Sequence, residues 1–395
     1  MYKSYIKYPD PTKIHFHSPS TYWPVQVADA YNFPKATGKG QTIGFIELGG
    51  SFNQADLDQY FKQMNLKVKP VKVVLINGAQ NTSDDSDGET YLDLCVALAI
   101  AHDAQGIVYR CGNSDTDFIA AINRAVADNV DVISISWGGP ERTWPSASIN
   151  KMNAAFQAAK DKGISVYAAS GDNGSSDGIN GNNVDFPASS PLVVGCGGTT
   201  LSYSSNKINS EVVWNDGSQG GATGGGLSMY FNLPSWQKTT LQTSTRVVPD
   251  LAGNADADTG YKIITNGQMG IAGGTSAVAP LMAALTAQLN EVLGKRLGFF
   301  LDQLYNHPEV FRDITSGNNG TYIARTGPDP CTGMGVPDGN KVLALLQNAQ
   351  PTPQPPVTPP TPTPIPNPTP TGSDYNLHFT NGVLTVDGYR LVKIA

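Results

Sequence analysis

Short apolar runs alternate with longer segments of helical periodicity along most of the chain. The runs are rich in Val, Ile and Phe and have the length of buried strands, whereas the longer segments repeat apolar residues at three- and four-residue spacing. The predicted strands are residues 41–48, 71–76, 106–110, 130–136 and 164–169, and the predicted helices are 89–102, 115–128, 148–162 and 281–293. This alternation predicts an α/β fold, a doubly wound, mainly parallel sheet with helices on both faces and active-site loops at its strand ends.

Composition divides the chain into four parts. Residues 1–22 are polar and contain prolines, which predicts an N-terminal arm, and residues 23–350 carry the α/β pattern. Residues 351–372 are almost entirely Pro and Thr, which is typical of a polyproline-II linker that extends up to roughly 60 Å. In residues 373–395, the turn pairs Asn381-Gly382 and Asp387-Gly388 predict a small β meander. Such a meander is too small to be stable alone, so we expect it to dock, oligomerise or bind a partner.

Charge and cysteine usage exclude several classes of function. The net charge is −7, which argues against a nucleic-acid partner, and only 15% of residues are charged, so few ion pairs would be lost in acid. No apolar run has the length of a membrane span, and no signal peptide is visible at the start of the chain. The four cysteines form no Cys-x-x-Cys pair, so we expect isolated buried thiols rather than a zinc site.

Ser276 is the first candidate catalytic residue. It follows two glycines and Thr275, directly before the apolar helix predicted at 281–293. Unpaired N–H groups in the first turn of a helix favour developing negative charge, which suits a nucleophile, although an ordinary helix N-cap has the same pattern. The sequence Gly-Thr-Ser-x-Ala-x-Pro resembles the nucleophile segment of the subtilisin superfamily, and such a nucleophile requires a base.

No histidine is suitably placed to be that base. His15 and His17 belong to the arm, His378 lies beyond the linker, His102 ends a predicted helix, and His307 precedes a proline. None is part of a His-Gly-Thr segment. A Ser-His-Asp peptidase of the subtilisin type remains an alternative, and a pH–rate profile that peaks at neutral pH or above would favour it.

Glu89 and Asp93 offer a different base. Their four-residue spacing places both carboxylates on one face of one helix. The rest of that helix is apolar and carries almost no other charge, which argues for burial, although a solvated helix start is the simpler alternative. A buried carboxylate pair cannot keep both groups ionised at low cost, so it shares protons and can act as a general base at acidic pH.

Taken together, these motifs resemble the sedolisin family of serine-carboxyl peptidases, and most of all its kumamolisin branch. The resemblance extends over about residues 23 to 340. Its segments are Gly88-Glu89-Thr90-Tyr91-Leu92-Asp93, Ser170-Gly171-Asp172, residues 186–191, Gly253-Asn254-Ala255-Asp256, residues 274–280 and Asp329-Pro330-Cys331-Thr332-Gly333. Several matches in the family's order are far more specific than one motif. The resemblance implies a subtilisin-like fold and an acid-active serine endopeptidase.

The resemblance also implies a role for each residue of the site. Ser276 is the nucleophile, Glu89 is its general base and acid, and Asp93 shares the proton of Glu89. Asp172 lines the oxyanion hole and must be protonated to donate there. In the kumamolisin branch the chain of hydrogen bonds extends through Glu47 and Trp137. The simpler alternatives are an exposed acid at a strand end for Glu47 and a core aromatic for Trp137.

One structural Ca²⁺ ion is implied in the same way. The matching ligands are the carboxylates of Asp313 and Asp329 and the backbone carbonyls of Ile314, Arg325 and Gly327. Oxygen ligands from two loops suit calcium. The chain has Arg325 where the family has glycine, and a structural loop without metal is the alternative.

The expected substrates are polypeptides. Ser136 and Gly138 belong to a predicted strand edge that would bind an extended peptide through its backbone. Asp185 matches a position that the kumamolisin branch associates with a basic side chain before the scissile bond, although a surface acid is an alternative. The resemblance further implies an extracellular or acidic compartment and a pro-domain, either removed or supplied separately. A non-catalytic binding protein that reuses the fold is the remaining alternative.

Overall fold

A computed structural model describes residues 1–9, 21–239, 241–348, 377–380, 383–386 and 389–390. The chain forms two compact units, Met1–Ala349 and Gln350–Ala395. Each unit is described by itself, and the first contains all the candidate site residues. The linker and the turn pairs Asn381-Gly382 and Asp387-Gly388 lie outside the described residues.

The core of the first unit is one large sheet. Its strand order is β10-β9-β7-β5-β2-β4-β3, and β13 also pairs with β9. Every pairing is parallel except that of β10 with β9. The strands are β2 (Thr42–Glu47), β3 (Lys72–Leu75), β4 (Gln105–Arg110), β5 (Val132–Ile135), β7 (Ser165–Ala169), β9 (Val194–Ser204), β10 (Lys207–Val213) and β13 (Leu251–Asn254). The predicted doubly wound, mainly parallel sheet is therefore confirmed.

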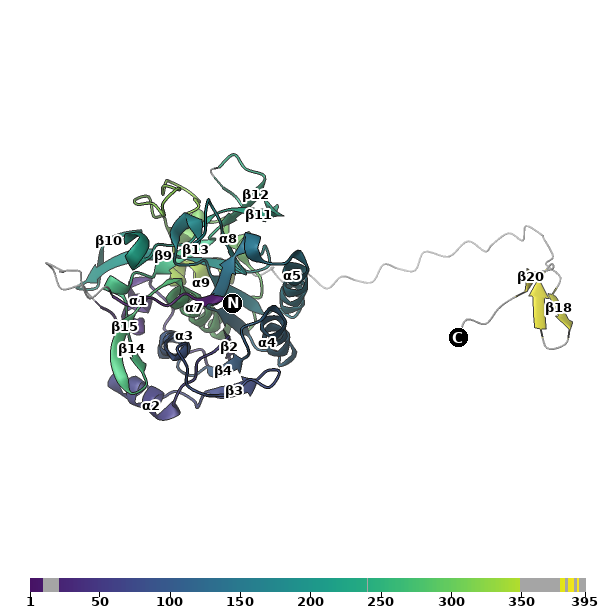
Figure 1. Cartoon of the computed structure of the whole chain (residues 1–395), viewed down its shortest axis with the longest axis horizontal. Coiled ribbons are helices and arrows are strands. Elements are labelled where there is room, and N and C mark those ends of the chain that lie inside the picture. Colours follow the sequence, from purple (N-terminus) through teal and green to yellow (C-terminus); the bar gives the residue numbers. More distant parts are fainter. Residues whose placement is uncertain (10–20, 240, 349–376, 381–382, 387–388, 391–395) are drawn as a thin grey trace. The chain divides into compact units, whose positions relative to one another are not determined.

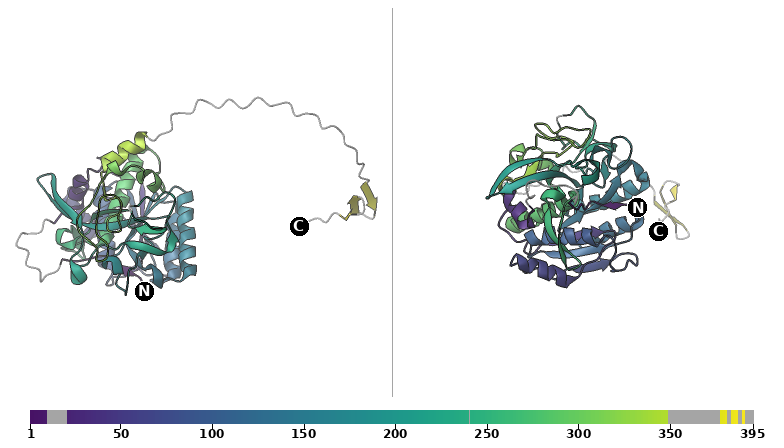
Figure 2. Two further views of the ribbon diagram at one scale, coloured as in Figure 1. Left: turned by 90° about the horizontal axis from the view of Figure 1, so that it is seen from above. Right: turned by 60° about the vertical axis from the view of Figure 1, so that its left-hand side comes forward.

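Helices cover both faces of this sheet. They are α1 (Pro24–Ala30), α2 (Gln54–Gln63), α3 (Asp87–Ile100), α4 (Asp115–Ala127), α5 (Ser146–Asp161), α6 (Gly217–Gly220), α7 (Val278–Leu293), α8 (Leu301–Leu304) and α9 (Gly339–Asn348). α4 and α5 lie side by side and belong to one apolar cluster, whereas α3 and α7 belong to the other (Figures 1 and 2). All of α3 is buried, as expected of a helix that is apolar on most faces.

Four smaller sheets complete the unit. β1 (Lys3–Ser4), β6 (Trp137–Pro140) and β8 (Asp185–Phe186) form a three-stranded antiparallel sheet. The paired strands are β11 (Gly226–Asn232) with β12 (Thr245–Val248), β14 (Tyr261–Thr265) with β15 (Gln268–Ala272), and β16 (Phe311–Arg312) with β17 (Val336–Pro337). The position of β1 is important for the site, because it attaches the start of the N-terminal arm to the body of the unit.

The second unit contains a three-stranded antiparallel sheet. Its strands are β18 (Leu377–Thr380), β19 (Val383–Val386) and β20 (Tyr389–Arg390). They flank the two predicted turn pairs, as expected for a meander. None of the helices in the described part of the chain combines the length and apolarity needed to cross a lipid bilayer. All four cysteines are buried free thiols, as predicted.

Candidate functional site

The candidate residues meet where strand ends face helix starts. Ser276 lies in the short turn Thr275–Ala277 directly before α7, and Asp172 follows β7. Glu89 and Asp93 project from successive turns of α3. All four side chains are buried. The alternative of a solvated helix start for Glu89 and Asp93 is therefore wrong.

The nucleophile candidate faces the N-terminal segment of the same chain. The backbone N–H of Ser276 donates to the carbonyl oxygen of Tyr5 at 3.2 Å. Its hydroxyl lies 3.4 Å from the carbonyl oxygen of Ser136. Gly274 precedes this turn with a φ of 95°, and a Cβ there would collide with the Tyr5 carbonyl oxygen and with Asp172 Oδ2. Gly274 therefore permits two oxygen atoms to approach the turn from the same side.

Glu89 and Asp93 form a buried acidic pair beside Ser276. Ser136 Oγ donates to Asp93 Oδ1 at 2.7 Å. Among the described residues, Asp93 Oδ2 and both oxygens of Glu89 have no hydrogen-bond partner. Burial, followed by the charges of Asp93 and Glu47, raises the pKa of Glu89 well above its ordinary range, whereas the nearby Ser276 hydroxyl lowers it. Unpartnered carboxylate oxygens next to a serine hydroxyl are suited to accept its proton.

Asp172 has one satisfied oxygen and one free oxygen. The backbone N–H and the hydroxyl of Thr275 both donate to Asp172 Oδ1 at 2.8 Å. Asp172 Oδ2 is buried without a partner among the described residues. Burial raises the pKa of Asp172 to about 7, against the opposing charge of Lys7 and the hydrogen bonds from Thr275. Below that pH the carboxyl is neutral, and its free oxygen can carry a proton to donate.

Glu47 and Trp137 lie together behind the acidic pair. Trp137 Nε1 donates to Glu47 Oε2 at 2.9 Å, and Glu47 is 0% exposed. Burial raises the pKa of Glu47 to about 8, although the hydrogen bond from Trp137 and the charge of Arg110 lower it. The alternative of an exposed acid at a strand end is therefore wrong for Glu47. The charge of Glu47 also raises the pKa of Asp93, so the two carboxyls are electrostatically linked.

The three candidate substrate-binding residues all contact the N-terminal segment. The carbonyl oxygen of Ser136 accepts the backbone N–H of Tyr5 at 3.2 Å, and Gly138 is the register partner of Lys3. The Tyr5 hydroxyl donates to Asp185 Oδ2. Asp185 is fully buried, so it is not the surface acid of the alternative interpretation. The first residues of the arm therefore lie in the cleft.

Asp177 is a second acid beside Asp185 that was not among the residues predicted from the sequence. Asp177 is buried, and its side chain and that of Asp185 both approach Gly171. Burial raises the pKa of Asp177 to about 8 and that of Asp185 well above its ordinary range, with the charge of Asp177 as the second cause for Asp185. Asp177 lies in a loop rich in Asn, Gly and Ser. A single acidic residue in such a loop matches no motif, so its burial could not be predicted from the sequence.

The carboxylates of the predicted calcium set converge on one loop. Gly327 donates its N–H to Asp313 Oδ2 at 2.8 Å, and Arg325 donates to Asp329 Oδ2 at 2.9 Å. Asp329 is fully buried; burial, with the charge of Asp313 as an additional cause, raises its pKa. Two hard, mutually repelling carboxylates on one loop fit a divalent cation. Carbonyl ligation by Ile314, Arg325 and Gly327 remains a prediction.

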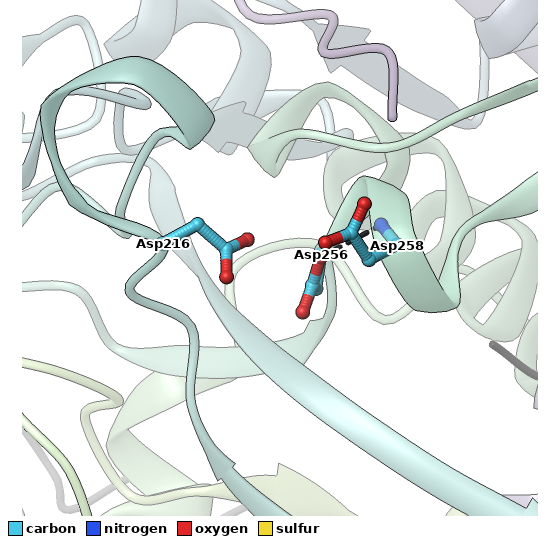
Figure 3. Close-up of side chains that lie close together, drawn as sticks. All are labelled: Asp216, Asp256 and Asp258. Atoms are coloured by element: carbon cyan, nitrogen blue, oxygen red, sulfur yellow. Dashed lines mark hydrogen bonds between the residues drawn. The ribbon is translucent and has the colours of Figure 1, made fainter. Parts of the chain in front are cut away.

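Another acidic cluster lies outside this set. Asp216 points toward Asp256 and Asp258, which come from a neighbouring short turn (Figure 3). The oxygens of Asp256 accept hydrogen bonds from Thr200 Oγ1 and from the Asp258 N–H. Burial and the charge of Asp216 raise the pKa of Asp256 to about 7. The carboxylate oxygens of Asp256 therefore already accept hydrogen bonds from other residues of the chain.

Neither His102 nor His307, the described histidines of the first unit, is a hydrogen-bond partner of the Ser276 hydroxyl. His102 follows α3, and a rise of 1.5 Å per residue places it about 20 Å along the helix direction from Glu89. His307 bonds Glu309. Among the described residues, the Ser276 hydroxyl has Ser136, not a histidine, as its hydrogen-bond partner.

Comparison with known proteins agrees with this geometry. A model of the Subtilase family matches residues 76–304. Kumamolisin from Bacillus sp. (strain MN-32) is 48% identical over 84% of this chain and 65% of its own length. Tripeptidyl-peptidase sed1 from Aspergillus fumigatus is 27% identical over 82% of this chain and 65% of its own length. The chain thus spans slightly less than two thirds of these relatives.

This chain covers almost the whole of one solved structure. Pseudomonas sedolisin, a serine-carboxyl proteinase complexed with two molecules of pseudo-iodotyrostatin, superposes with a TM-score of 0.78 at 31% identity. The match covers 84% of this chain and 99% of the sedolisin chain. The subtilisin-like fold expected from the sequence is therefore confirmed.

The buried carboxyls predict an unusual pH dependence of stability. Glu47, Glu89, Asp93, Asp172 and Asp185 have pKa values raised mainly by burial, so between about pH 4 and pH 7 the folded chain binds more protons than the unfolded chain. Stability is then greatest at low pH and falls as pH rises, by about 1.4 kcal/mol per pH unit for each such proton.

Thermal unfolding of Ser276→Ala, which avoids self-digestion, should therefore show a lower Tm at pH 7 than at pH 4. The lowered pKa values of Asp87 and Asp115 oppose this trend, but the five raised carboxyls outnumber them. Adding Asp172→Asn removes one titrating carboxyl and should make the decline between pH 4 and pH 7 less steep. A Tm that rises steadily from pH 4 to pH 7 would contradict the raised pKa values.

Proposed function

This chain belongs to the sedolisin family of serine-carboxyl peptidases, and from that premise we propose that it is an acid-active endopeptidase that cleaves polypeptides through an acyl-enzyme. One observation carries the proposal. The N–H of Ser276 donates to the Tyr5 carbonyl oxygen, this oxygen and the free oxygen of Asp172 both approach Gly274, and Glu89 lies beside the serine hydroxyl. A nucleophile, a base and an oxyanion site thus surround one bond.

In the first step, Ser276 Oγ attacks the substrate carbonyl carbon while Glu89 takes its proton. The tetrahedral intermediate carries its negative charge on the former carbonyl oxygen. The Ser276 N–H and a protonated Asp172 donate to that oxygen, and this stabilises the charge where it develops. Glu89 then gives the proton to the leaving amine, the C–N bond breaks, and an ester on Ser276 remains.

In the second step, a water molecule hydrolyses the ester with Glu89 again as base. Asp93 shares the proton of Glu89, and the Ser136 hydroxyl holds Asp93 through its 2.7 Å hydrogen bond. Glu47 and Trp137 extend this set, since the charge of Glu47 acts on both Asp93 and Glu89. When several buried carboxyls share fewer protons than there are carboxyl groups, one of them is ionised and can act as the base in place of a histidine.

The course of the N-terminal segment favours endopeptidase over tripeptidyl-peptidase activity. Five residues, Met1 to Tyr5, extend to the non-primed side of the carbonyl that faces Ser276. A tripeptidyl-peptidase binds only three residues there, because its product is a tripeptide. A cleft that already accommodates a fourth and a fifth residue is open at that end and can cut inside a longer chain.

We also propose that the chain binds one structural calcium ion. The carboxylates of Asp313 and Asp329 would hold it, together with the carbonyls of Ile314, Arg325 and Gly327. The ion would neutralise two nearby carboxylates and fix the loop that carries them. The proposed activity at low pH and the family together favour an acidic, extracellular setting.

The catalytic set predicts which substitutions abolish activity. Ser276→Ala removes the nucleophile and Glu89→Gln removes the base, so each should reduce turnover on an unstructured protein by roughly 10³-fold or more. His102→Ala is the matched control and should retain wild-type turnover. The measurement is release of peptides at acidic pH by proteins with the same circular dichroism. A folded His102→Ala protein without activity would indicate a Ser-His-Asp mechanism instead.

The oxyanion role of Asp172 predicts a pH-dependent difference between two variants. Asp172→Ala removes a donor and should reduce turnover by roughly 10²–10³-fold. Asp172→Asn keeps a donor that does not titrate, so it should retain more activity. The wild type should lose activity as pH rises through about 7, where Asp172 ionises, whereas Asp172→Asn should lose less. Equal impairment of Asn and Ala variants at every pH would rule out a donor role.

Calcium binding predicts a stability loss on chelation. A ligand that binds only the folded state stabilises it, so chelation should lower the Tm of the Ser276→Ala protein. Adding Asp329→Ala should give a low Tm with or without chelator. Adding Asp216→Ala is the control and should leave the response to chelator intact, since Asp216 belongs to the other acidic cluster. An unchanged Tm, with no metal found by elemental analysis, would refute the site.

A further inference from the structure

A buried arginine lies beside Glu47, the carboxyl behind the acidic pair. Glu47 ends β2 and Arg110 ends β4, and the two residues are register partners in the parallel sheet. Register partners on neighbouring parallel strands are about 4.8 Å apart and belong to the same face of the sheet. Arg110 is 5% exposed, so its charge is buried as well. The fold therefore places a buried cation next to a carboxyl of the proposed catalytic set.

The carboxylate that pairs with Arg110 is partly in solvent. Arg110 Nη2 donates to Asp84 Oδ2 at 3.0 Å, and the Asp84 side chain is 42% exposed. Among the described residues, Arg110 Nη1 and Glu47 Oε1 are both buried without a hydrogen-bond partner. Asp84 thus binds only one of the two terminal nitrogens of the guanidinium, and water reduces the effect of its charge. Part of the positive charge of Arg110 remains to act on Glu47.

Asp84 also fixes the start of the helix that carries the proposed base. Its Oδ1 accepts the backbone N–H groups of Gly50 and Ser86, each at 2.8 Å. Ser86 is the residue directly before α3, and Gly50 follows β2 closely in the chain. The guanidinium of Arg110, the loop before α3 and the chain after β2 are therefore held together. This fixes the position of the cation relative to Glu47.

The other titratable groups around Glu47 come from α3 and β4. α3 carries Glu89 and Asp93, and the charge of Glu47 raises the pKa of both. β4 leads into Cys111, whose backbone N–H donates to the Glu47 carbonyl oxygen at 2.8 Å. Burial raises the pKa of the Cys111 thiol, so this thiol is neutral in acid. These groups contribute negative charge or none.

The remaining elements packed on β2 are β5, α4 and α7. β5 and the first three turns of α7 contain no charged residue. The charged residues of α4 have partners elsewhere, since Asp117 accepts from Asn77 and Arg124 bonds Asp128. Arg110 is therefore the cation that faces Glu47 from the part of the chain that the structure describes.

Arg110 and Asp84 act on Glu47 with opposite signs. Burial is the largest cause that raises the pKa of Glu47, to about 8. Besides the hydrogen bond from Trp137, the charge of Arg110 lowers this pKa, whereas the charge of Asp84 raises it. Ionised Glu47 in turn raises the pKa of Glu89. The charges of Arg110 and Asp84 therefore reach the base through Glu47.

We propose that Arg110 is a positioning residue that sets the acid limit of activity, because it attracts the negative charge of the buried carboxyls to Glu47 and so leaves the shared proton on the acidic pair. Asp84 opposes this effect. The inference rests on the proposed peptidase function. Without the cation, Glu47 competes better for the proton, so Glu89 stays ionised to a lower pH. Glu89 is then also a weaker base.

The test measures kcat/KM on one peptide from pH 2 to pH 8 for the full chain and its variants. Arg110→Met removes the charge and keeps much of the volume, so it should lower the acid-side midpoint by roughly half a pH unit or more. Asp84→Asn should raise that midpoint. Arg110→Lys keeps the charge and should restore the wild-type midpoint. The alkaline-side midpoint should not move, since the pKa of Asp172 responds to burial, Lys7 and Thr275.

The direction of each shift separates three accounts. If the ion pair only anchored the loop before α3, Arg110→Met and Asp84→Asn would both break it and would change the profile alike. If Arg110 acted on Glu89 directly, removal of its positive charge would raise the acid-side midpoint. Only action through Glu47 gives a fall for Arg110→Met and a rise for Asp84→Asn. Any other pair of results would overturn the inference.

Arg124→Met and Asp128→Asn are the matched controls. They break an ion pair of similar length, 2.9 Å, at the surface of α4, and both midpoints should stay unchanged. If Arg110→Met does not fold, Asp84→Asn decides alone, because Asp84 is partly exposed and its substitution removes no buried group. An acid-side midpoint that stays or falls in Asp84→Asn would then overturn the inference.

The same profiles distinguish this failure from failure of the proposed function. If the wild type cuts the peptide in acid but the acid-side midpoints coincide in all variants, the peptidase proposal stands and the role of Arg110 is wrong. If no folded preparation, the wild type included, cuts the peptide at any pH, the peptidase proposal fails and this inference fails with it.

Discussion

The site depends on carboxyl groups for which burial outweighs the opposing charge of nearby cationic side chains. Glu47, Glu89, Asp93 and Asp172 are all buried, and burial is the largest cause that raises the pKa of each. An ordinary carboxyl is a weak base and is already ionised at pH 5, so it neither donates to an oxyanion nor shares a proton. Burial changes both properties, because the charged form loses its hydration. The proposed activity in acid follows from this single constraint.

The fold provides this burial through two helices. α3 is buried along its whole length, and its first two turns carry Glu89 and Asp93 into the interior. α7 begins at Val278, directly after the turn that contains Ser276, and is buried from Val278 to Asn290. Because the sheet is parallel, the residues that follow β5 and β7 meet these helix starts at one edge, where Ser136 and Asp172 complete the site. The apolar core is thus continuous with the environment that raises the pKa values.

The sequence predicted what depends on periodicity and on local chemistry. Buried strands and helices have clear patterns, and the i,i+4 spacing of Glu89 and Asp93 follows from helical geometry alone. α7 begins at Val278 rather than at the predicted 281, because Pro280 is tolerated in a first turn. The course of residues 1–9 was not predictable, since an extended segment pairs wherever a strand edge and a pocket exist, and neither is encoded in the segment. Asp177 was missed for the same reason, because its buried position beside Asp185 depends on distant residues that the fold brings to it.

The protonation state of Asp172 is the most direct test of this account. Infrared difference spectra between the Ser276→Ala protein and the same protein with Asp172→Asn isolate the carboxyl of one residue. The account predicts the carbonyl stretch of a neutral carboxylic acid at pH 5, with conversion to the carboxylate bands as pH rises through about 7. Carboxylate bands already complete at pH 5 would show that burial does not hold the proton on Asp172 and would contradict the proposed oxyanion site.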